Sequence, residues 1–477
     1  MSLEEIRSER LKKTVIIQDK GFESYPAETE RTHSASEAVK KFAYLAKSKK
    51  YITLAGRILA RREHGGSTFI DLYDGTGKIQ VYFKKDLLGE AYDFFLQTGD
   101  VGDFVETSGD LFKTQKEEKT LLVKNWRMLS KTLLPLPEKW HGLQDVDERF
   151  RKRYLDLLMN EGVRERFELR TKIIKSLREF LDTHDFLEVE TPLLHPVPGG
   201  AIARPFVTHH NALDMDLYLR VAPELYLKRL LVGGFERVYE IGRNFRNEGI
   251  SPQHNPEFTM LECYAAFWDE RAMMSFTEDM FLQLVEAVGK KENYKKPFAR
   301  LAFKEVLKRH AQIMDYDKET RDTLATRAKQ LGIDIGKQES KGKIADEIYK
   351  KICRPHLLQP TFITDHPIEI SPLAKQKSDN KEEVRRFQLI VSGLELANAF
   401  SELNDPIEQR KRFEGQEKER AGGEEEAHRV DEDFIEALEY GMPPAAGLGI
   451  GIDRLVMFLT DTKNIKEVLL FPTMRPK

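Results

Sequence analysis

The residues best suited to chemistry in this sequence are concentrated between Phe235 and Ala266. Two runs of β-type residues flank a loop there and carry basic, acidic and aromatic side chains, among them Arg243, Arg246, Glu248, His254, Glu257, Phe258, Glu262 and Tyr264. If the runs pair as antiparallel strands, alternate side chains share one face. Such a face offers a guanidinium to an anion, an aromatic plane to a ring and carboxylates to a cation. A solvent-exposed charged hairpin is the alternative interpretation.

A second segment, GLGIGIDRL, combines glycines at alternate positions with a charged pair, and Gly449 is its central glycine. A residue without a side chain lets the backbone approach a ligand closely, although crowding by neighbouring strands would explain the same glycines. The sequence contains neither GxxxxGK[ST] nor GxGxxG after a predicted strand. A bound nucleotide would therefore be held by side chains rather than by a glycine-rich helix entrance.

Short β-type runs separated by glycine turns precede these segments. They are Ile52–Ala60, Thr68–Tyr73, Lys78–Phe83, Phe104–Phe112 and Thr120–Leu129. Runs of this length and spacing favour a small closed barrel, and a barrel with a basic face fits an OB-fold. Residues 40–62 supply such a face, because they are rich in lysine and arginine and contain no Asp or Glu. Another small barrel or sandwich would fit the same pattern.

Two prolines between Leu133 and Pro137 predict a stiff linker, so we place a domain boundary near Asp145 and expect units at 1–145 and 146–477. In the second unit the spacing predicts an amphipathic helix over 161–183. Further β-type runs are predicted at 217–222, 235–241, 257–266, 387–391 and 447–451. We expect an α+β unit with a large antiparallel sheet flanked by helices, and a small helical insertion near 301–356.

Composition sets the class of protein. With 477 residues, 40% of them hydrophobic, the chain is too long for one ordinary core and apolar enough to fold completely. No window approaches a membrane span, and the charged start lacks the apolar stretch of a secretion signal, which predicts a cytoplasmic protein without membrane partners. Cys263 and Cys353 lack metal-site spacing and predict neither a zinc cluster nor a disulfide framework.

Three ordered segments resemble the motifs of class II aminoacyl-tRNA synthetases. FLEVETPLL is similar to motif 1, FRNEGISPQHNPEFTMLE to motif 2 and GLGIGIDRLVMFL to motif 3. The resemblance is strongest to bacterial-type lysyl-tRNA synthetases and extends from the predicted barrel to LLFPTMRP, nearly the whole chain. It implies activation of L-lysine with ATP and transfer to tRNA(Lys) by a homodimer whose interface contains motif 1.

The resemblance also implies an ATP site. Arg246 would neutralise the α-phosphate and the lysine carboxylate, and with Arg454 it is an implied catalytic residue. Glu248 would contact the adenine and Phe258 would stack on it, while His254 and Arg454 would hold the outer phosphates. The implied ATP-binding residues are Arg246, Glu248, His254, Phe258, Glu395, Gly449 and Arg454.

The amino-acid substrate carries an ammonium at each end, so acids should select it. By resemblance, Glu224 and Gly200 hold the α-amino group, and Glu402 with Tyr264 holds the side-chain ammonium. The implied lysine-binding residues are Gly200, Glu224, Arg246, Glu262, Tyr264, Asn398, Phe400 and Glu402. A wrong amino acid would leave a buried carboxylate unpaired, which favours lysine over aspartate or asparagine.

One position departs from the family. Relatives have a carboxylate seven residues before the position of Glu395, and the two share Mg²⁺, whereas this chain has Gln388 there. An amide oxygen can ligate Mg²⁺ but brings no negative charge. We therefore expect Glu395 to be a metal residue and one metal ion to bind more weakly at Gln388.

In the barrel, Phe69, Gln80 and Glu118 match the family's anticodon contacts, and stacking with edge recognition is how single-stranded RNA loops are read. Two other functions stay open. A related ligase could attach lysine to a protein, although such relatives resemble the catalytic unit alone. A non-catalytic RNA-binding relative could keep the fold, although it would be expected to lose the charged motif residues that this chain has.

Overall fold

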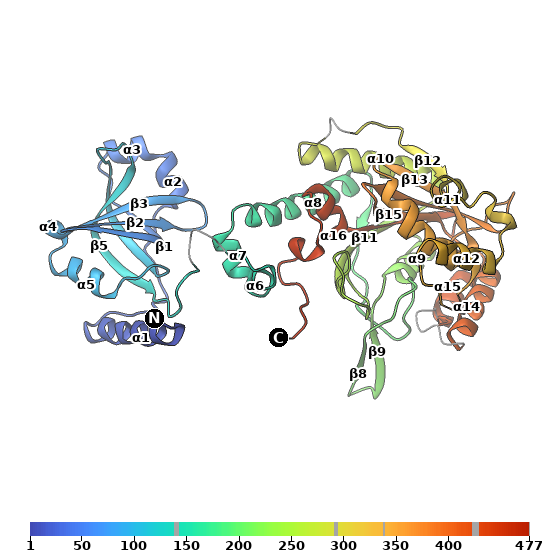
Figure 1. Ribbon diagram of the computed structural model, residues 1–477, viewed down its shortest axis with the longest axis horizontal. Helices are drawn as coiled ribbons and strands as arrows, with labels where there is room; N and C mark the ends of the chain where they lie inside the picture. Colours follow the sequence, from blue (N-terminus) through green and yellow to red (C-terminus); the bar gives the residue numbers. More distant parts are fainter. Residues whose placement is uncertain (138–142, 291–293, 337–338, 422–428, 477) are drawn as a thin grey trace. The chain divides into compact units, whose positions relative to one another are not determined.

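The computed structural model describes residues 1–137, 143–290, 294–336, 339–421 and 429–476. Two compact units, Met1–Gln144 and Asp145–Lys477, make up the chain. Figure 1 shows the first unit in blue to cyan and the second in green to red. None of the described helices is both long and apolar enough to cross a membrane.

The first unit is a closed β-barrel with short helices around it. Its elements are α1 (Leu3–Asp19), α2 (Ala35–Lys40), α3 (Phe42–Lys47), β1 (Ile52–His64), β2 (Ser67–Tyr73), β3 (Lys78–Lys84), α4 (Lys85–Leu88), α5 (Glu90–Thr98), β4 (Phe104–Lys113) and β5 (Lys119–Ser130). The strand order is β1-β2-β3-β5-β4, in which β3 and β5 run parallel and the other pairs antiparallel. Apolar side chains alternate inward along the strands, as in Ile70 and Leu72 of β2.

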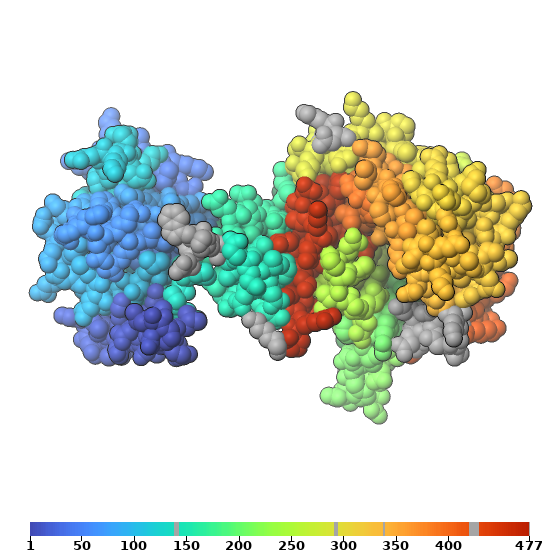
Figure 2. All heavy atoms as spheres, viewed as in Figure 1, coloured from blue at the N-terminus to red at the C-terminus, as the bar shows by residue number. Residues whose placement is uncertain are grey.

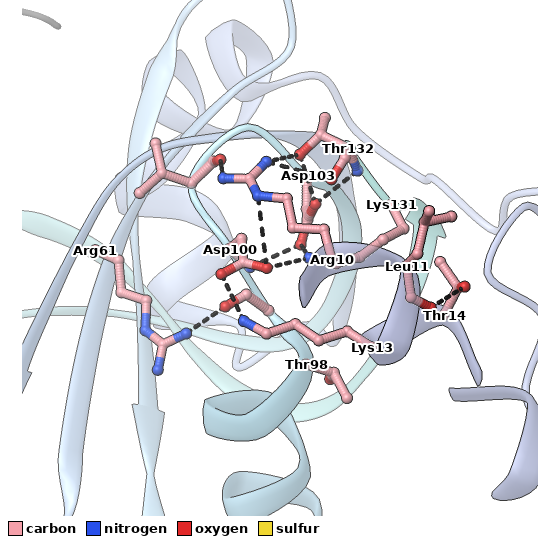
Figure 3. Close-up of polar contacts among 12 residues, drawn as sticks. Arg10, Leu11, Lys13, Thr14, Arg61, Thr98, Asp100, Asp103, Lys131 and Thr132 are labelled. Atoms are coloured by element: carbon pink, nitrogen blue, oxygen red, sulfur yellow. Dashed lines mark hydrogen bonds and ion pairs between the residues drawn. The ribbon is translucent and has the colours of Figure 1, made fainter. Parts of the chain in front are cut away.

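Helix α1 is attached to the barrel by buried charges (Figure 3). The Lys131 ammonium has no exposed side-chain surface and lies 2.6 Å from a carboxylate oxygen of Asp103, which is equally buried. Lys13 of α1 reaches Asp100 at 2.7 Å, and Arg10 donates to the Thr132 hydroxyl at 2.7 Å. Because each buried charge has a partner, the network holds α1 against the end of β5 without leaving an unpaired ion.

The second unit is built on a wide sheet. Its N-terminal elements are α6 (Val146–Arg151), α7 (Arg153–Met159), α8 (Val163–Thr183), β6 (Leu187–Glu188), β7 (Leu194–His195), β8 (Val207–His210), β9 (Met215–Leu219), α9 (Glu224–Val232), β10 (Arg237–Phe245), β11 (Glu257–Ala266) and α10 (Glu270–Ala287). They continue with β12 (Ala299–Ala302), α11 (Phe303–Ala311), η2 (Tyr316–Lys318), α12 (Arg321–Gln330), α13 (Lys341–Ile348), the π-helical turn η3 (Tyr349–Cys353), η4 (Arg354–His356), β13 (Thr361–Pro367), η5 (Ile368–Ile370), β14 (Glu383–Val391), β15 (Leu394–Ser401), α14 (Pro406–Ala421), α15 (Glu432–Glu439), β16 (Ala445–Gly451), α16 (Ile452–Leu459) and η6 (Ile465–Val468).

Within the described residues the sheet has eight strands in the order β12-β13-β14-β15-β16-β11-β10-β6. All pairs from β13 to β10 are antiparallel, whereas the edge strands β12 and β6 pair in parallel with their neighbours. The inner strands therefore form the large antiparallel sheet that the sequence predicts, and the sheet is mixed only at its two edges. The edge strands are short, so each can take its direction from the helix that precedes or follows it.

The sheet has one apolar face. Helices α8, α10 and α16 pack there, and the core includes Leu177, Met280, Cys263, Leu448 and Ala399. A smaller apolar cluster joins α11, α12, α13 and η3, including Phe303 and Ile344, and forms the core of the insertion. Since side chains alternate along each strand, the residues between these core positions face the other side of the sheet. That side carries the polar residues predicted to do chemistry.

Candidate active site

Strand register places the predicted site residues in two rows across the sheet. In one row, Glu262 of β11 is opposite Gly449 of β16, which is opposite Asn398 of β15, and Asn398 is opposite Gln388 of β14. In the next row, the corresponding residues are Tyr264, Gly447, Phe400 and Arg386. The rows are two residues apart on every strand, so they share a face. These rows form the floor of a cavity of about 640 Å³, and residues of the insertion line its rim.

One end of the cavity is cationic. Arg246 follows β10, where its backbone N–H donates to the Pro256 carbonyl at 2.8 Å, and its guanidinium lies 5.0 Å from the centre of the Phe258 ring. Arg454 lies 3.0 Å from Nε2 of His254. Burial lowers the pKa of His254, and the nearby charge of Arg454 lowers it further. The imidazole is therefore neutral near pH 7, and the arginines supply the positive charge.

Neighbouring residues hold this end in place. Asp453 accepts from Arg170 of α8 at 2.6 Å and from the backbone N–H of Thr259 at 2.8 Å, which ties α16 to β11. The Nε atom of Arg246 is buried and has no hydrogen-bond partner among the described residues. Glu248 lies in the exposed loop after β10 rather than on the strand, yet it lines the cavity together with Arg246. The arrangement leaves donors available for an anion.

The other end of the cavity is acidic. Glu224 at the start of α9 and Glu262 are buried, and the Tyr264 hydroxyl donates to Glu262 at 2.9 Å. Burial raises the pKa of Glu262 to about 8, and the charge of Glu224 adds to that rise. Burial likewise raises the pKa of Glu224. Carboxylates held in this way favour a cationic ligand, because an ammonium would relieve the cost of ionising them.

Glu402 lies behind the cavity wall. Its side chain has no exposed surface and touches the ammonium of Lys228, which is equally buried. A carbon atom added to Gly447 would meet Oε1 of Glu402 at 2.2 Å and the Tyr264 ring at 2.4 Å. Glu402 therefore borders the cavity at Gly447, while Asn398 and Phe400 line it directly. Lys228 itself was not predicted, since a lysine in a helix gives no sequence signal of burial.

Gly200 lies beside Glu224. Its φ of +90° lies in a region that favours glycine, and an added carbon atom would lie 3.0 Å from Ala222 and 3.1 Å from Glu224. The backbone can thus approach the acidic end of the cavity. Gly200 and Glu224 both line the cavity, as the resemblance implied they would if they share one ligand group.

The two candidate metal residues both line the cavity. Gln388 is buried in β14, and its Oε1 has no hydrogen-bond partner among the described residues. Glu395 of β15 is partly exposed, and its Oε2 lies 3.6 Å from the Arg354 guanidinium. A carboxylate and an unpartnered amide oxygen are the hard oxygen donors that Mg²⁺ accepts. Among the described residues there is no group of three or more His, Cys, Asp or Glu side chains placed to hold a metal ion.

The barrel carries an aromatic ladder on its outer face. The Phe69 and Tyr82 rings are stacked at 4.5 Å with an interplanar angle of 8°, and Phe112 lies 6.1 Å beyond Tyr82. The Gln80 side-chain oxygen, on the same face, accepts from the Thr120 hydroxyl at 2.9 Å. Glu118, two residues before Thr120 in the sequence, is exposed. Tyr82 and Phe112 were not predicted, although Tyr82 is two residues from Gln80 and must share its face.

The basic stretch of residues 40–62 divides into two parts. The lysines at positions 40, 41, 47, 49 and 50 are exposed. Arg57 instead donates to the Gly102 carbonyl, and Arg61 donates to the Leu96 carbonyl. Arg62 is exposed and pairs with Asp71 at 2.9 Å. The exposed positive charge of the stretch predicted to face phosphate therefore comes from these lysines and Arg62.

Comparison with known proteins agrees with this geometry. Residues 145–475 match the family model described as tRNA synthetases class II (D, K and N), and residues 52–129 match the OB-fold nucleic acid binding domain. The chain belongs to the class II tRNA synthetases. Within that class, three relatives named lysine--tRNA ligase are similar over almost their whole length, and the chain is a member of the lysine--tRNA ligase family.

The three relatives come from different bacteria. The protein of Carboxydothermus hydrogenoformans is 50% identical over 100% of this chain and 99% of its own. That of Pelotomaculum thermopropionicum is 50% identical over 100% and 96%, and that of Moorella thermoacetica 51% identical over 98% and 97%.

The contact between Gly447 and Glu402 generates a prediction. Gly447→Ala should raise the KM for lysine at least about tenfold and change the KM for ATP little, because the added methyl group displaces Glu402 and Tyr264 at the acidic end, and overpacking costs about 1–3 kcal/mol. Lysine-dependent exchange of pyrophosphate into ATP measures both constants. Gly415→Ala, in exposed helix α14 with open space around it, is the matched control. An unchanged KM for lysine would show that Gly447 does not border the amino-acid site.

Proposed function

We propose that this chain activates L-lysine with ATP, forms lysyl-adenylate and transfers the lysyl group to tRNA(Lys). The observation that carries the proposal is that one cavity has buried carboxylates at one end and two arginines, Arg246 and Arg454, at the other. The acidic end suits an amino acid with two ammonium groups, and the cationic end suits a triphosphate. The relatives named lysine--tRNA ligase support the choice of lysine.

The charges of the cavity suit the chemistry of activation. An oxygen of the lysine carboxylate attacks the α-phosphorus, the bond from that phosphorus to the oxygen shared with the β-phosphate breaks, and pyrophosphate leaves. Arg246 would stabilise the negative charge that builds between the two reactants, as a donor held in place before the reaction. His254 and Arg454 would bind the leaving phosphates, and Phe258 would stack on the adenine, with Glu248 and Gly449 beside the nucleotide.

Two other functions fit less well. A ligase that attaches lysine to a protein would not need the barrel, yet the barrel matches a nucleic acid binding domain and carries an aromatic ladder. A non-catalytic relative would not need charged cavity residues, yet Arg246, Glu248, Glu395 and Arg454 all line the cavity. The tRNA ligase reaction uses both features.

Arg246→Ala should abolish lysine-dependent pyrophosphate exchange while the protein stays folded, because the guanidinium is needed most as charge builds on the α-phosphate. Loss of such a preorganised donor costs about 10²–10³ in rate. Arg243→Ala is the matched control. Arg243 is an exposed residue of β10, three positions before Arg246, and its guanidinium lies 3.5 Å from the Glu257 carboxylate. Near-normal exchange by Arg246→Ala would contradict the proposed role.

Phe69→Ala should weaken aminoacylation of tRNA(Lys) and leave lysine activation unchanged, because the aromatic ladder belongs to the first unit and the cavity to the second. Stacking on an aromatic side chain contributes about 1–3 kcal/mol per base, so the KM for tRNA should rise roughly tenfold or more. Aminoacylation and pyrophosphate exchange are measured on the same preparation. Unchanged tRNA binding would show that this face does not read the anticodon, and Gln80 and Glu118 would then lose their proposed role.

Mg²⁺ is the expected companion of ATP, and Glu395 with Gln388 would hold it at the cavity. When bound, the ion would neutralise phosphate charge during activation. Gln388→Glu should lower the Mg²⁺ concentration needed for half-maximal lysine activation, because a carboxylate replaces a neutral oxygen donor. The equilibrium affinity for Mn²⁺ in the presence of ATP, measured by electron paramagnetic resonance, is a second readout. If neither titration moves, position 388 does not contribute to metal binding.

We further propose a cytoplasmic homodimer. Apolar side chains are exposed along β6 to β9 and the segment between them, including Leu187, Leu193, Leu194, Val207 and Met215. The β8–β9 hairpin, in green, stands out from the surface of this unit in Figure 2. Exposed apolar groups of this kind mark interaction surfaces, and Leu187, Leu193 and Leu194 belong to FLEVETPLL, the segment that resembles motif 1. Sedimentation equilibrium of Leu194→Glu should show dissociation relative to the unchanged chain, and a chain that is monomeric throughout would refute the dimer.

A further inference from the structure

Lys228 is a buried cation at the acidic end of the cavity. It lies in α9, its side chain has no exposed surface, and its ammonium is 2.6 Å from Oε1 of Glu224. The same ammonium touches Oε2 of Glu402. Aromatic rings of Phe400 and Phe434 lie 5.4 Å and 5.9 Å from it. A lysine is almost never fully buried unless it is paired, so this position carries a specific requirement.

The two carboxylates that Lys228 joins are the ones proposed to bind opposite ends of the substrate. Glu224 would receive the α-ammonium and Glu402 the side-chain ammonium. They are 178 residues apart in sequence, on α9 and directly after β15. No ion pair between Glu224 and Glu402 could hold them together, because both are acids. A shared cation behind them can fix their separation, since its ammonium has three donors to distribute.

We propose that Lys228 is a positioning residue of the amino-acid site, which holds Glu224 and Glu402 at a set separation and so selects a diamine of lysine's length. The inference rests on the proposed function, because it assigns one substrate ammonium to each acid. Lys228 does not line the cavity and contacts neither reactant. It acts through the carboxylates.

The electrostatics of the neighbouring groups agree with this role. Burial opposes the charge of Lys228, yet Glu224 and Glu402 outweigh it and raise the pKa of the ammonium. Burial raises the pKa values of both acids, that of Glu402 well above its usual range, and Lys228 is the largest influence that opposes this rise. The attraction of Lys228 to both acids therefore favours the contacts that hold them in place.

Other charged groups face the same site from the strands around it. Glu262 and Tyr264 come from β11, Arg386 comes from β14, and the charges of Arg220 and Arg246 also act on Glu262. Of the acids, Glu262 has its pKa raised to about 8 by burial and by the charge of Glu224.

Calorimetric titration of lysine at pH 7 measures its affinity for the protein. Lys228→Met, which keeps the length of the side chain, should bind lysine roughly a hundredfold more weakly and ATP about as well as before. An unchanged affinity for lysine in the variant would overturn the proposal.

Chain length gives an independent readout. The preference for lysine over ornithine, which is one methylene shorter, should fall about tenfold in Lys228→Met if the ammonium sets the separation of the acids. Arg229→Met is the matched control, since Arg229 lies on the same helix and pairs with Asp431 at 2.9 Å away from the cavity. It should keep the affinity for lysine and the preference for lysine over ornithine.

The outcomes separate the two proposals. Lysine-dependent pyrophosphate exchange by the unchanged protein tests the function alone. If exchange occurs but Lys228→Met keeps the affinity for lysine and the preference for lysine over ornithine, the proposed role of Lys228 is wrong. If Lys228→Met loses ATP binding as well, the ratio of its calorimetric affinities for lysine and ornithine decides.

Discussion

The active site depends on one strand, β16, that carries glycines on the face turned toward the cavity. β16 lies between β11 and β15, and its glycines leave the floor of the cavity open between two rows of functional groups. Gly447 leaves room for Glu402 and Tyr264, and larger residues would collide with them. The opposite face of the same strand packs Leu448 and Ile450 into the core. The alternation of glycine and apolar residues along β16 thus packs one face of the strand into the core and leaves space for the cavity on the other face.

The cavity has positive charge at one end and negative charge at the other, and the cost of burying that charge is offset differently at the two ends. At the cationic end the arginines are partly accessible, Asp453 ties α16, which carries Arg454, to β11, and the Phe258 ring lies beside Arg246. The acidic end is buried, where unpaired carboxylates would be expensive. Lys228 pairs with two of its acids and the charge of Arg386 acts on Glu224, and a substrate with two ammonium groups would add further positive charge. Selection of the substrate by charge would follow from the acids that this end gathers.

The two units have separate cores and separate tasks. The barrel places aromatic rings on an outer face and satisfies its buried ions internally through Lys131, Asp100 and Asp103. The second unit encloses its reactants between the sheet and the insertion, whose core is also separate. Because neither core needs the other, changes on the barrel can affect RNA recognition without altering the cavity.

The sequence by itself determined the class of protein, the strands near the motifs and a minority of the residues that line the cavity, since these follow from local alternation and from ordered motifs. It also indicated the barrel, although not Tyr82 and Phe112 as its further aromatic residues. Tertiary structure alone decided which other residues meet across long separations, as with Arg170 and Asp453 or Lys228 and Glu402. Strand register and helix packing set such pairs, and neither leaves a mark in local sequence. For the same reason Lys228 looks like any lysine on a helix, and Arg57 and Arg61 look like surface charges, until the folded chain shows what surrounds them.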